Sequence, residues 1–596
     1  MKVADYILDY LVLQKVKHVF LMVGGAIAFA VDAFSKRHDI EYICVAHEQA
    51  GAMMAESYAR VGPGLGVAMT TSGPGATNLI TGICCAWFDS IPTLFITGQV
   101  NTYEQKSISK VRQVGFQETE IVDIVRPITK FAVKIDRAED TRFLLEKAVY
   151  IAKTGRPGPV LIDIPLDLQK TEIKSSTLKK FIPPKEKQYK DTGLILKTKI
   201  EKVLTLIAQS KRPLILAGGG IRLAGAVNEI HQMVKLTGIP VVNSWSGYDL
   251  FAHNHSLFIG THGVYGERGA NFAVQNCDLL ISIGSRLDTR QTGGKPETYA
   301  RAAKIVMIDI DQTELDKRRG LTPAVSIQAD AKEFLRAFIK EFPAINKSRT
   351  VEWIKHCATW REKYPTVLLQ YYEEKKYVNP YVFAQVLSKE LKNDAIVIPD
   401  TGATLTWIMQ GFELKQGQRL FSAFGNSPMG YSFPAAIGAS FARGKKEIIC
   451  INGDGGFQIN IQELQTLVYH KLPVKIFILN NHGYGIIKQF QEMYLDSRFE
   501  ATGKGYSCPD FIKIAQAYGI KSVSIRSHTH LSKKIKEVLS HRGPVLCDVY
   551  LNDDQKIIPK LSFGSPIEDL FPLLPRDEFR RNMIIPPIKT KKEASI

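Results

Sequence analysis

Small and oxygen-bearing residues follow a buried strand in the last third of the chain. The apolar run IICIN leads into Gly453-Asp454-Gly455, and Asn480-Asn481 follows after a helical pattern and a further apolar strand. Glycines let a backbone approach a phosphate closely. Carboxylate and amide oxygens are ligands that Mg²⁺ accepts while it keeps positions for phosphate oxygens. The spacing therefore predicts a magnesium and diphosphate site, with Asp454, Asn481 and Gly483 at the metal and Gly453, Gly455 and Gly456 at the phosphates.

A single carboxylate stands at the start of an Ala- and Met-rich segment near the N-terminus. The segment reads HEQAGAMMAESYAR over residues 47–60, and its composition predicts a buried helix that begins close to Glu48. A buried carboxylate needs a partner, and a helix N-terminus stabilises negative charge. Glu48 is therefore either a catalytic carboxylate or a helix-start residue held by the dipole. His47 has the same two interpretations, as a polar group of the site or as a helix-start residue.

The strands and helices around these residues occur in two similar sets. Residues 67–78 read VAMTTSGPGATN and are followed by IPTLFITGQ, whereas residues 448–460 read IICINGDGGFQIN and are followed by LPVKIFILNN. Each set later reaches a similar closing strand, GRPGPVLIDI in the first and HRGPVLCDVY in the second. Short apolar runs alternate with helical patterns in both sets, which is typical of parallel sheets with helices on both faces. The pattern predicts one α/β unit used twice.

A third α/β segment separates the two copies. It contains the strand-like runs PLILAGGG, DLLISIGS and KIVMIDID. We predict three doubly wound parallel-sheet domains over residues 1–180, 195–345 and 373–552, followed by a C-terminal arm and basic tail over residues 553–596. The arm is proline-rich, and we expect it to pack over the last domain.

Composition places the chain among ordinary globular proteins. Of its 596 residues, 45% are hydrophobic and 23% are charged. No apolar run approaches the roughly 20 residues that span a bilayer, and the first residues read as an amphipathic helix without a secretory signal. We therefore expect a cytoplasmic protein with no membrane partner. Much of the excess positive charge behind the net +18 lies in lysine-rich stretches over residues 179–202 and 589–592. They read as solvated linker and tail, so no nucleic-acid partner is predicted.

The spacing of GDG and NN, together with the duplicated unit, resembles the cofactor signature of the thiamine-diphosphate-dependent decarboxylases and carboligases. In that family one copy holds the diphosphate with Mg²⁺, and the related copy holds the aminopyrimidine. The resemblance implies that Glu48 hydrogen-bonds the pyrimidine and so activates the thiazolium carbon as a nucleophile. The cofactor then carries the difficult chemistry.

Further stretches narrow the resemblance to the acetolactate synthase branch. Residues 23–34 (VGGAIAFAVDAF), the run TSGPGATNL, residues 115–119 (GFQET) and the run SPMGYSFPAAIGA are all similar to it. The resemblance implies roles in catalysis or substrate binding for several residues. They are Gly25 beside the thiazolium, Phe116 and Gln117 near the reaction centre, Met429 against the bent cofactor, Thr404 at the diphosphate, Arg290 at the carboxylate of the acceptor, and Phe490 in the acceptor pocket.

The middle segment resembles the flavin-binding domain of acetolactate synthases and pyruvate oxidases. Glycine loops after strands suit the phosphates of a dinucleotide, so we expect FAD there, in a structural role without net electron transfer. Some relatives bind ADP in this domain, and others bind nothing. The residues that carry this expectation are Gly218, Gly219, Gly220, Gly260, Thr261, His262, Gly263, Gly284, Arg286, Asp288, Asp309 and Asp330.

Several features depart from the acetolactate synthase pattern. Residues 400–404 read DTGAT where the family has Gln-His for the diphosphate. Phe490 stands where the family commonly has the tryptophan that favours 2-oxobutyrate as the acceptor, and residues 107–113 also differ. The tail over residues 558–585 is closer to acetolactate synthase-like proteins of surface-sugar clusters.

The expected activity is decarboxylation of pyruvate and transfer of the two-carbon unit to a second 2-oxo acid. Alternatives are a nucleotide-linked ketosugar or another carbonyl acceptor, pyruvate oxidase, and a non-catalytic nucleotide- or DNA-binding relative. In the family the two ends of one cofactor come from different subunits, which implies a homodimer or homotetramer. We expect the helix over residues 49–55 to line the subunit interface. A regulatory subunit is compatible with this expectation.

Overall fold

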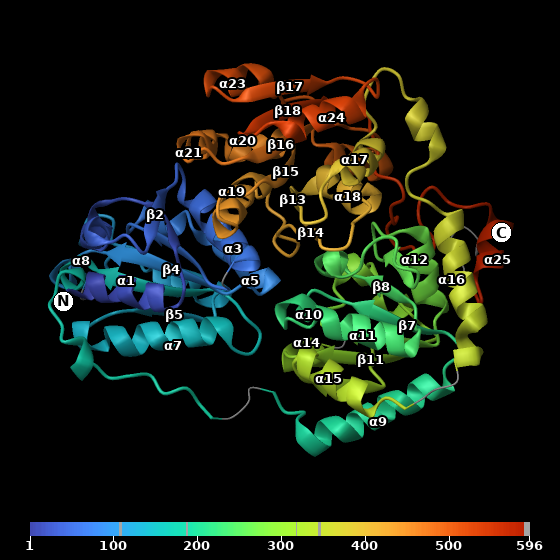
Figure 1. The fold of residues 1–596 in the computed structure, drawn as a ribbon, viewed down its shortest axis with the longest axis horizontal. Coiled ribbons are helices and arrows are strands. Elements are labelled where there is room, and N and C mark those ends of the chain that lie inside the picture. The colour runs from blue at the N-terminus through green and yellow to red at the C-terminus, as the bar shows by residue number, and fades with distance from the viewer. Residues whose placement is uncertain (63, 107–109, 186–188, 318, 344–346, 589–596) are drawn as a thin grey trace.

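The computed structural model describes the chain except residues 63, 107–109, 186–188, 318, 344–346 and 589–596. Figure 1 shows three helix-covered sheets, and each sheet has six parallel strands. We call each sheet with its helices the first, central and third domain, in chain order. The basic tail over residues 589–592 and part of the segment over residues 107–113 lie outside the described residues.

The first and third sheets repeat one topology. The first sheet contains β1 (His18–Met22), β2 (Glu41–Cys44), β3 (Gly66–Thr70), β4 (Thr93–Gln99), β5 (Phe131–Lys134) and β6 (Val160–Pro165). The third contains β13 (Ile396–Pro399), β14 (Arg419–Leu420), β15 (Ile448–Gly453), β16 (Val474–Asn480), β17 (Lys521–Ile525) and β18 (Val545–Tyr550). Their orders are β2-β1-β3-β4-β6-β5 and β14-β13-β15-β16-β18-β17, which are identical when each set is numbered from its own first strand. This identity confirms the duplicated α/β unit.

The central sheet has the strand order of a dinucleotide-binding fold. Its strands are β7 (Pro213–Ala217), β8 (Val241–Asn243), β9 (Phe258–Thr261), β10 (Leu279–Ile283), β11 (Lys304–Asp309) and β12 (Val325–Gln328). They lie in the order β12-β11-β10-β7-β8-β9, which changes direction between β7 and β10. At such a switch point the loops at the carboxyl ends of the strands diverge and leave a crevice.

Helices alternate with the strands along the chain, as the sequence pattern predicts. In the first domain they are α1 (Val3–Leu13), α2 (Ala28–Asp32), α3 (Glu48–Val61), α4 (Pro74–Thr77), α5 (Ile80–Asp89), α6 (Ile121–Val125), α7 (Thr141–Lys153) and α8 (Leu166–Gln169). The central domain has α9 (Gly193–Gln209), α10 (Gly220–Leu223), α11 (Val227–Thr237), α12 (Arg268–Asn276), α13 (Thr289–Thr292), α14 (Gln312–Asp316), α15 (Ala331–Glu341) and α16 (Val351–Lys363). The third domain and the arm have α17 (Pro380–Glu390), α18 (Gly402–Gly411), α19 (Ser432–Ala442), α20 (Asp454–Ile459), α21 (Leu464–Tyr469), α22 (Gly485–Tyr494), α23 (Phe511–Ala517), α24 (Leu531–Ser540) and α25 (Arg576–Asn582).

Two general features of these helices bear on the sequence predictions. None in the described ranges is long and apolar enough to span a bilayer. The basic stretch over residues 179–202 is only partly linker, because its second half belongs to α9. Ile200 and Val203 of that helix are fully buried in the core of the central domain.

The first and third domains meet through two helices rich in small residues. α3 and α19 pack side by side, and Ser57 Oγ donates to the carbonyl of Ala435 at 2.8 Å. A Cβ added at Gly438 would lie 2.2 Å from the carbonyl oxygen of Met54, so only glycine permits this approach. Residues 50–59 of α3 are all buried as a result. The expectation that residues 49–55 line a subunit interface is wrong, because α19 of the same chain covers this face.

A buried network of charges fixes the C-terminal end of α3. Arg60 pairs with Glu56 and with Asp89, each at 2.5 Å. The hydroxyl of Tyr431 donates to Glu56 at 2.5 Å, and Asp89 accepts two backbone N–H groups from the loop before α19, at 2.9 and 2.8 Å. Because each buried charge has a partner of opposite sign or a hydrogen bond, the network links both domains without leaving an isolated ion.

The C-terminal arm packs mainly over the central domain, which corrects the expectation that it covers the last one. Its first residues cross α18 and α22, and the rest lies along α12 and α16, with α25 beside them (Figure 1). Amides on α12 hold the backbone of the arm: Asn271 donates to the carbonyl of Ile567 at 2.7 Å, and Asn276 donates to that of Asn582 at 2.9 Å. Buried amides need such partners, and the arm supplies them.

We expect Gly438→Ala to destabilise the protein, because its Cβ would overlap the Met54 carbonyl and force α3 away from α19. Overpacking of this kind costs about 1–3 kcal/mol, so the midpoint of thermal unfolding should fall by several degrees. Gly503→Ala is the matched control, since a Cβ there meets nothing within 4 Å. Scanning calorimetry compares the two variants with the parent protein. Equal midpoints would show that the two helices separate without cost.

Candidate active site

Asp454 and Asn481 lie where two neighbouring strands of the third sheet end. In the parallel register of β15 and β16, Gly453 pairs with Leu479. Asp454 opens α20 directly after β15, and Asn481 follows the last residue of β16. The two side chains therefore belong to the same edge of the sheet, as their spacing in the sequence predicts.

The Asp454 carboxylate is buried without a cation. It is 2% exposed, and its Oδ2 atom accepts the backbone N–H of Gly483 at 3.1 Å and the hydroxyl of Tyr506 at 2.8 Å. No lysine or arginine of the described residues pairs with it. Burial raises the pKa of Asp454 to about 6. The Nδ2 atom of Asn481 is also buried and has no hydrogen-bond partner among the described residues. Within the described residues, Asp454 therefore lacks a cation and the Asn481 amide nitrogen lacks a hydrogen-bond acceptor.

A cavity of about 520 Å³ opens beside these groups. Its walls include, among others, Thr404, Met429, Gly453, Asp454, Gly455, Gly456, Asn481, Gly483 and, from the central domain, Trp245 and Arg290. No group of three or more His, Cys, Asp or Glu side chains in the described parts of the chain is placed to hold a metal. A metal here must therefore use amide, carbonyl and external oxygens besides one carboxylate. That donor set suits Mg²⁺ bound together with a diphosphate.

The glycines of this loop are required by their neighbours as well as by a ligand. A Cβ at Gly455 would lie 2.5 Å from the ring of Tyr484, and one at Gly456 would lie 2.1 Å from the carboxylate of Asp400. A Cβ at Gly453 would approach the hydroxyl of Thr404 to 3.0 Å. Tyr484, Asp400 and Thr404 therefore pack closely against this loop, and the loop itself lines the cavity.

Asp400 holds the loop that carries Met429. Its carboxylate is buried and accepts the backbone N–H groups of Gly430 at 3.0 Å and Ser432 at 3.1 Å. Burial raises the pKa of Asp400 to about 6. Met429 lies in the cavity wall, with its Cε 3.4 Å from the Cβ position of Gly455. In this chain the departure at residues 400–404 thus places a structural carboxylate beside Thr404.

Glu48 is the first residue of α3 and is 9% exposed. Its Oε2 atom accepts a hydrogen bond from Asn78 Nδ2 at 2.9 Å. His47 is the N-cap, where its ring nitrogen accepts the backbone N–H of Gln49 at 3.1 Å, so the helix-start interpretation of His47 holds. Glu463 of the third domain accepts the backbone N–H groups of the two residues before Glu48, at 3.0 and 3.1 Å. The catalytic candidate is therefore positioned from both domains.

The loop over residues 71–75 lies beside Glu48 at one residue and beside Gln117 at another. A Cβ at Gly75 would lie 2.7 Å from the side chain of Thr71 and 3.5 Å from Glu48 Oε1. Gly73 contacts Gln117, which adopts a left-handed backbone with φ of 65°, a conformation that is costly away from glycine. The Thr71 hydroxyl is buried without a partner among the described residues.

Gly25 and Phe116 lie at the surface near this loop. Gly24, next to Gly25, would clash with Thr71 at 2.5 Å if it carried a Cβ, and a Cβ at Gly25 would meet nothing within 4 Å. Phe116 precedes Gln117 and is 84% exposed. Glu48 does not line the cavity that contains Asp454. Within one chain, the groups predicted for the pyrimidine and those predicted for the diphosphate form two separate half-sites.

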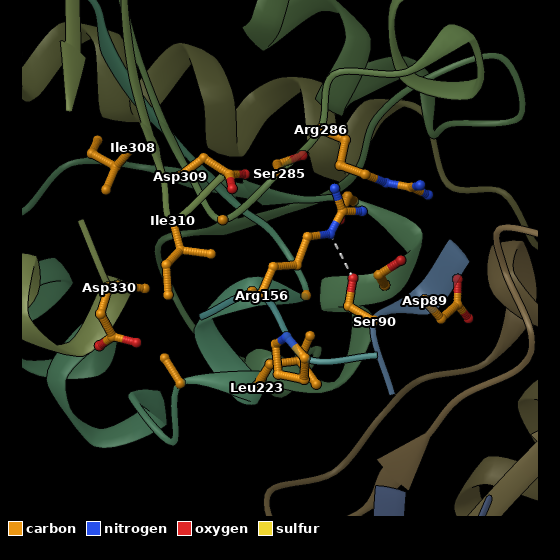
Figure 2. A pocket seen from close by; sticks show the side chains of 18 of the residues that line it. Asp89, Ser90, Arg156, Leu223, Ser285, Arg286, Ile308, Asp309, Ile310 and Asp330 are labelled. Carbon is orange, nitrogen blue, oxygen red and sulfur yellow. Dashed lines mark hydrogen bonds between the residues drawn. The ribbon is translucent and has the colours of Figure 1, made fainter. Parts of the chain in front are cut away.

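A second cavity, of about 300 Å³, lies between the first and central domains at the switch point of the central sheet (Figure 2). Arg156 crosses it and pairs with Asp311 at 3.0 Å and Glu314 at 2.9 Å, while its Nε donates to Ser90 at 2.8 Å. The predicted nucleotide residues in its wall are Gly219, Gly220, Gly284, Arg286, Asp288, Asp309 and Asp330. Burial raises the pKa of Asp309 to about 6.

Backbone loops, hydroxyls and arginines line this cavity, and they suit a dinucleotide phosphate. Three of the predicted residues also have local structural roles. The Asp288 and Asp330 side chains cap α13 and α15 by accepting backbone N–H groups. A Cβ at Gly218 would lie 2.1 Å from the carbonyl oxygen of Gly284, so the close crossing of two loops requires glycine there.

The structure does not bring the segment Gly260, Thr261, His262 and Gly263 to this cavity. The polar groups of this segment have partners inside the domain: Thr261 Oγ1 donates to Asn243 at 2.6 Å, and His262 contacts the carbonyl of Asn243 at 3.1 Å and the hydroxyl of Tyr299 at 2.9 Å. Burial lowers the pKa of His262 to about 4, so its ring is neutral at pH 7. The nucleotide role of this segment stays a prediction.

The two predicted substrate residues lie on different elements. Arg290 is in α13 and reaches the cavity of the third domain, where its guanidinium lies 5.9 Å from the ring centre of Trp245 and 5.3 Å from that of Tyr265. Phe490 is in α22 and packs in an aromatic cluster with Tyr494 and with Phe563 of the arm, at ring distances of 5.0 and 5.6 Å.

Four residues that contact the half-sites or the central cavity were absent from the sequence predictions: Asn78, Arg156, Glu463 and Tyr506. Asn78 and Arg156 lie in the stretches TSGPGATN and GRPGPV, which the internal repeat already marks. Glu463 and Tyr506 act over 417 and 52 positions of the chain. A local sequence pattern does not predict contacts between residues so far apart in the chain.

Known proteins are similar to this chain along nearly its whole length. Models of the thiamine pyrophosphate enzymes match in order: the N-terminal TPP binding domain over residues 1–124, the central domain over 200–338, and the C-terminal TPP binding domain over 400–549. The acetolactate synthase large subunit of Cyanidium caldarium is 35% identical over 566 residues, which is 94% of each chain. That of Lactococcus lactis is 34% identical over 578 residues, covering 95% of this chain and 96% of the relative. A probable acetolactate synthase large subunit of Methanocaldococcus jannaschii is 35% identical over 580 residues, covering 96% and 95%.

These matches preserve the order of the three domains and include both half-sites. The duplicated sheets correspond to the two TPP binding domains, which accounts for their identical topology. The central sheet corresponds to the central domain of the same enzymes. The chain is thus a thiamine-diphosphate-dependent enzyme and belongs to the family of the acetolactate synthase large subunits.

Proposed function

We propose that the protein is an acetolactate synthase, which decarboxylates pyruvate and transfers the two-carbon unit to a second 2-oxo acid. The observation that carries this proposal is the reach of Arg290 from the central domain into the cavity of Asp454 and Asn481. A guanidinium suits a carboxylate because its N–H groups match the two oxygens. The names of the relatives support the same activity.

Bound thiamine diphosphate supplies the carbon nucleophile and the electron sink for decarboxylation. In this proposal Glu48 holds the proton at the pyrimidine nitrogen, and Asn78 orients its carboxylate. Met429 provides an apolar wall beside Gly455, where the cofactor would bend.

Mg²⁺ would be held by the carboxylate of Asp454, the amide oxygen of Asn481 and the carbonyl of Gly483. A divalent cation neutralises the buried carboxylate and, with the diphosphate, completes the coordination. Thr404 and the glycine loop over residues 453–456 line the same cavity and would meet the phosphate oxygens.

The central cavity would take FAD, with Gly219, Gly220 and Gly284 beside its phosphates and Arg156 nearby. The strand order of the central sheet supports a dinucleotide. A carboligation has no net electron transfer, so the flavin would be structural in this proposal. The residue bounds 1–180, 195–345, 373–552 and 553–596 remain our proposed domain limits.

Glu48 does not line the cavity of Asp454 and Asn481 in its own chain, so we propose a homodimer or a dimer of dimers with shared sites. Glu48 of one subunit would then complete the site of Asp454 and Asn481 in the other. The term "large subunit" in the names of the relatives also supports the proposal that a smaller regulatory subunit binds this protein.

The activity itself is tested by incubating the protein with thiamine diphosphate, Mg²⁺, FAD and pyruvate and identifying the products by mass. We expect acetolactate and CO₂. Glu48→Gln should lower turnover by about 10²–10⁴-fold, the range of a lost acid–base group, while thiamine diphosphate still binds. The exposed Glu139→Gln is the matched control. Peroxide formed in proportion to pyruvate would instead indicate an oxidase, and full activity of Glu48→Gln would refute its role.

The raised pKa of Asp454 predicts how cofactor binding depends on pH. The metal needs the carboxylate form, so the affinity for Mg²⁺ and thiamine diphosphate should fall as the pH drops below about 6, by up to tenfold per unit. In the cation-free protein, protonation relieves a buried charge and stabilises the fold below that pH, so acid weakens binding and not folding through this group.

Fluorescence titrations of the cofactor at pH 5.3 and 7.5 measure this dependence. Asp454→Asn should weaken binding by more than about 10²-fold and remove its part of the pH dependence. The exposed Asp394→Asn should keep both. Unchanged affinity of Asp454→Asn in the presence of a chelator would contradict the metal assignment.

The shared-site proposal predicts complementation between two inactive variants. A mixed dimer of Glu48→Gln and Asp454→Ala chains contains one site with both defects and one with neither. Random exchange at equal amounts should restore about a quarter of the parent activity. Mixtures that stay inactive after confirmed exchange, or an active monomer in sedimentation, would show that each chain completes its own site.

A further inference from the structure

Tyr506 reaches the Asp454 carboxylate from a segment outside the cavity of the third domain. Its hydroxyl donates to Oδ2 of Asp454 at 2.8 Å, although Tyr506 does not line that cavity. The ring of Tyr506 packs against that of Tyr484, with the ring centres 4.6 Å apart and the ring planes at 64°. Tyr484 in turn lies against Gly455 of the glycine loop. A phenol thus holds the acid from outside the cavity into which the acid faces.

The segment that carries Tyr506 is anchored to α22 and to the residues just before it. Thr502 Oγ1 donates to the side chain of Gln491 at 2.6 Å, and Gln491 donates back to the carbonyl of Glu500 at 2.8 Å. The backbone N–H of Tyr484 donates to the carbonyl of Thr502 at 3.3 Å. Thr502 and Gln491 are both buried. The fold therefore determines where Tyr506 stands, because its segment is bound by buried side chains.

The two oxygens of Asp454 differ in what they bind. Oδ2 accepts both the Tyr506 hydroxyl, at 2.8 Å, and the backbone N–H of Gly483, at 3.1 Å. A carboxylate oxygen offers two lone-pair directions, so these two donors occupy both. No side chain of the described residues donates to the other oxygen, Oδ1. Asp454 therefore keeps a single oxygen available for a ligand from outside the protein.

Asp400 shows that this arrangement is specific to Asp454. Asp400 is a second buried acid beside the same loop, and its oxygens share their donors equally. Oδ2 accepts the backbone N–H of Gly430 at 3.0 Å, and Oδ1 accepts that of Ser432 at 3.1 Å. A carboxylate that serves structure alone thus uses both oxygens, whereas Asp454 has both of its donors on one.

The number of free oxygens bears on which cation the site accepts. Mg²⁺ requires near-octahedral coordination at about 2.0–2.1 Å, whereas Ca²⁺ accepts six to eight oxygens at about 2.3–2.6 Å and often binds both oxygens of one carboxylate. If a cation bound both oxygens of Asp454, it would have to displace the Tyr506 hydroxyl or the Gly483 N–H group from Oδ2. Coordination through Oδ1 alone requires no such displacement.

We propose that Tyr506 is a positioning residue that restricts Asp454 to coordination through one oxygen and thereby favours Mg²⁺ over Ca²⁺. This inference rests on the proposed function, which places a divalent cation at Asp454, and it adds what selects that cation. The hydroxyl of Tyr506 also fixes the orientation of the carboxylate, as outer partners of metal ligands do. The contribution of Tyr506 is thus to cation affinity and preference, without contact with the substrate.

The test compares the two cations in the absence of turnover. Calorimetric titrations of Mg²⁺ and of Ca²⁺, each alone, into metal-free protein with saturating thiamine diphosphate give the two dissociation constants. Tyr506→Phe keeps the ring against Tyr484 and removes only the hydroxyl. The affinity for Mg²⁺ should fall about 10- to 100-fold, the usual effect of losing an outer partner of a metal ligand. The affinity for Ca²⁺ should change less than about threefold, because the freed lone pair of Oδ2 lets the larger ion bind both oxygens.

Tyr469→Phe is the matched control, because Tyr469 belongs to the same domain and is 75% exposed. Both of its dissociation constants should equal those of the parent protein. Unfolding midpoints of the metal-free variants separate a local effect from loss of the fold. An unchanged ratio of the two dissociation constants in Tyr506→Phe would overturn the inference, whether both affinities stay the same or both fall together.

Asp454→Asn in the same titrations distinguishes this inference from the proposed function. If Asp454→Asn removes binding of both cations and Tyr506→Phe shifts their ratio toward Ca²⁺, the inference is supported even where no ketol acid forms. If Asp454→Asn removes binding but Tyr506→Phe keeps the parent ratio, only the role of Tyr506 is refuted. If Asp454→Asn binds both cations like the parent protein, the metal assignment fails, and the role of Tyr506 fails with it.

Discussion

The contact between α3 and α19 determines where Glu48 stands. Glu48 begins a helix whose residues 50–59 are all buried, so its backbone is fixed by the packing of that helix. Gly438 permits the two helices to approach, and Glu463 binds the backbone just ahead of Glu48 from the third domain. The position of one catalytic candidate is therefore set by the packing of two domains that are far apart in the sequence.

One buried network of paired charges supports the fold, whereas the charge of Asp454 has no cation as a partner among the described residues. Arg60, Glu56 and Asp89 neutralise one another between the first and third domains. Asp454, by contrast, is buried with hydrogen bonds but without a cation, and its raised pKa expresses that cost. Asp400 is also buried with a raised pKa, but backbone N–H groups of Gly430 and Ser432 satisfy its oxygens. Asp454 differs because the nearby Asn481 amide has no partner among the described residues, and the two groups together indicate a missing ligand.

The sequence predicted the sheets well because buried parallel strands are continuous apolar runs with a clear local pattern. It also located Asp454 and Asn481, because both residues follow such strands directly. Other parts depend on contacts between distant segments, which local patterns do not contain. Glu463 and Tyr506 were missed for this reason, and the arm was assigned to the wrong surface because its amide partners Asn271 and Asn276 belong to another domain. The segment Gly260–Gly263 stays a prediction, since its polar groups have partners inside the domain and it does not line the central cavity.

The duplicated unit explains why the chemistry of the two halves differs at equivalent places. The third strand of each unit, β3 in one and β15 in the other, ends at the same position of the same topology. After β3 comes the uncharged loop over residues 71–75, beside Glu48, whereas after β15 comes Asp454. An uncharged loop with one carboxylate nearby suits an aromatic ring that needs a single hydrogen bond, and a buried acid in a glycine loop suits a metal with phosphates. Because α3 and α19 occupy equivalent places in the two units, the contact that joins the first and third domains is made by corresponding helices.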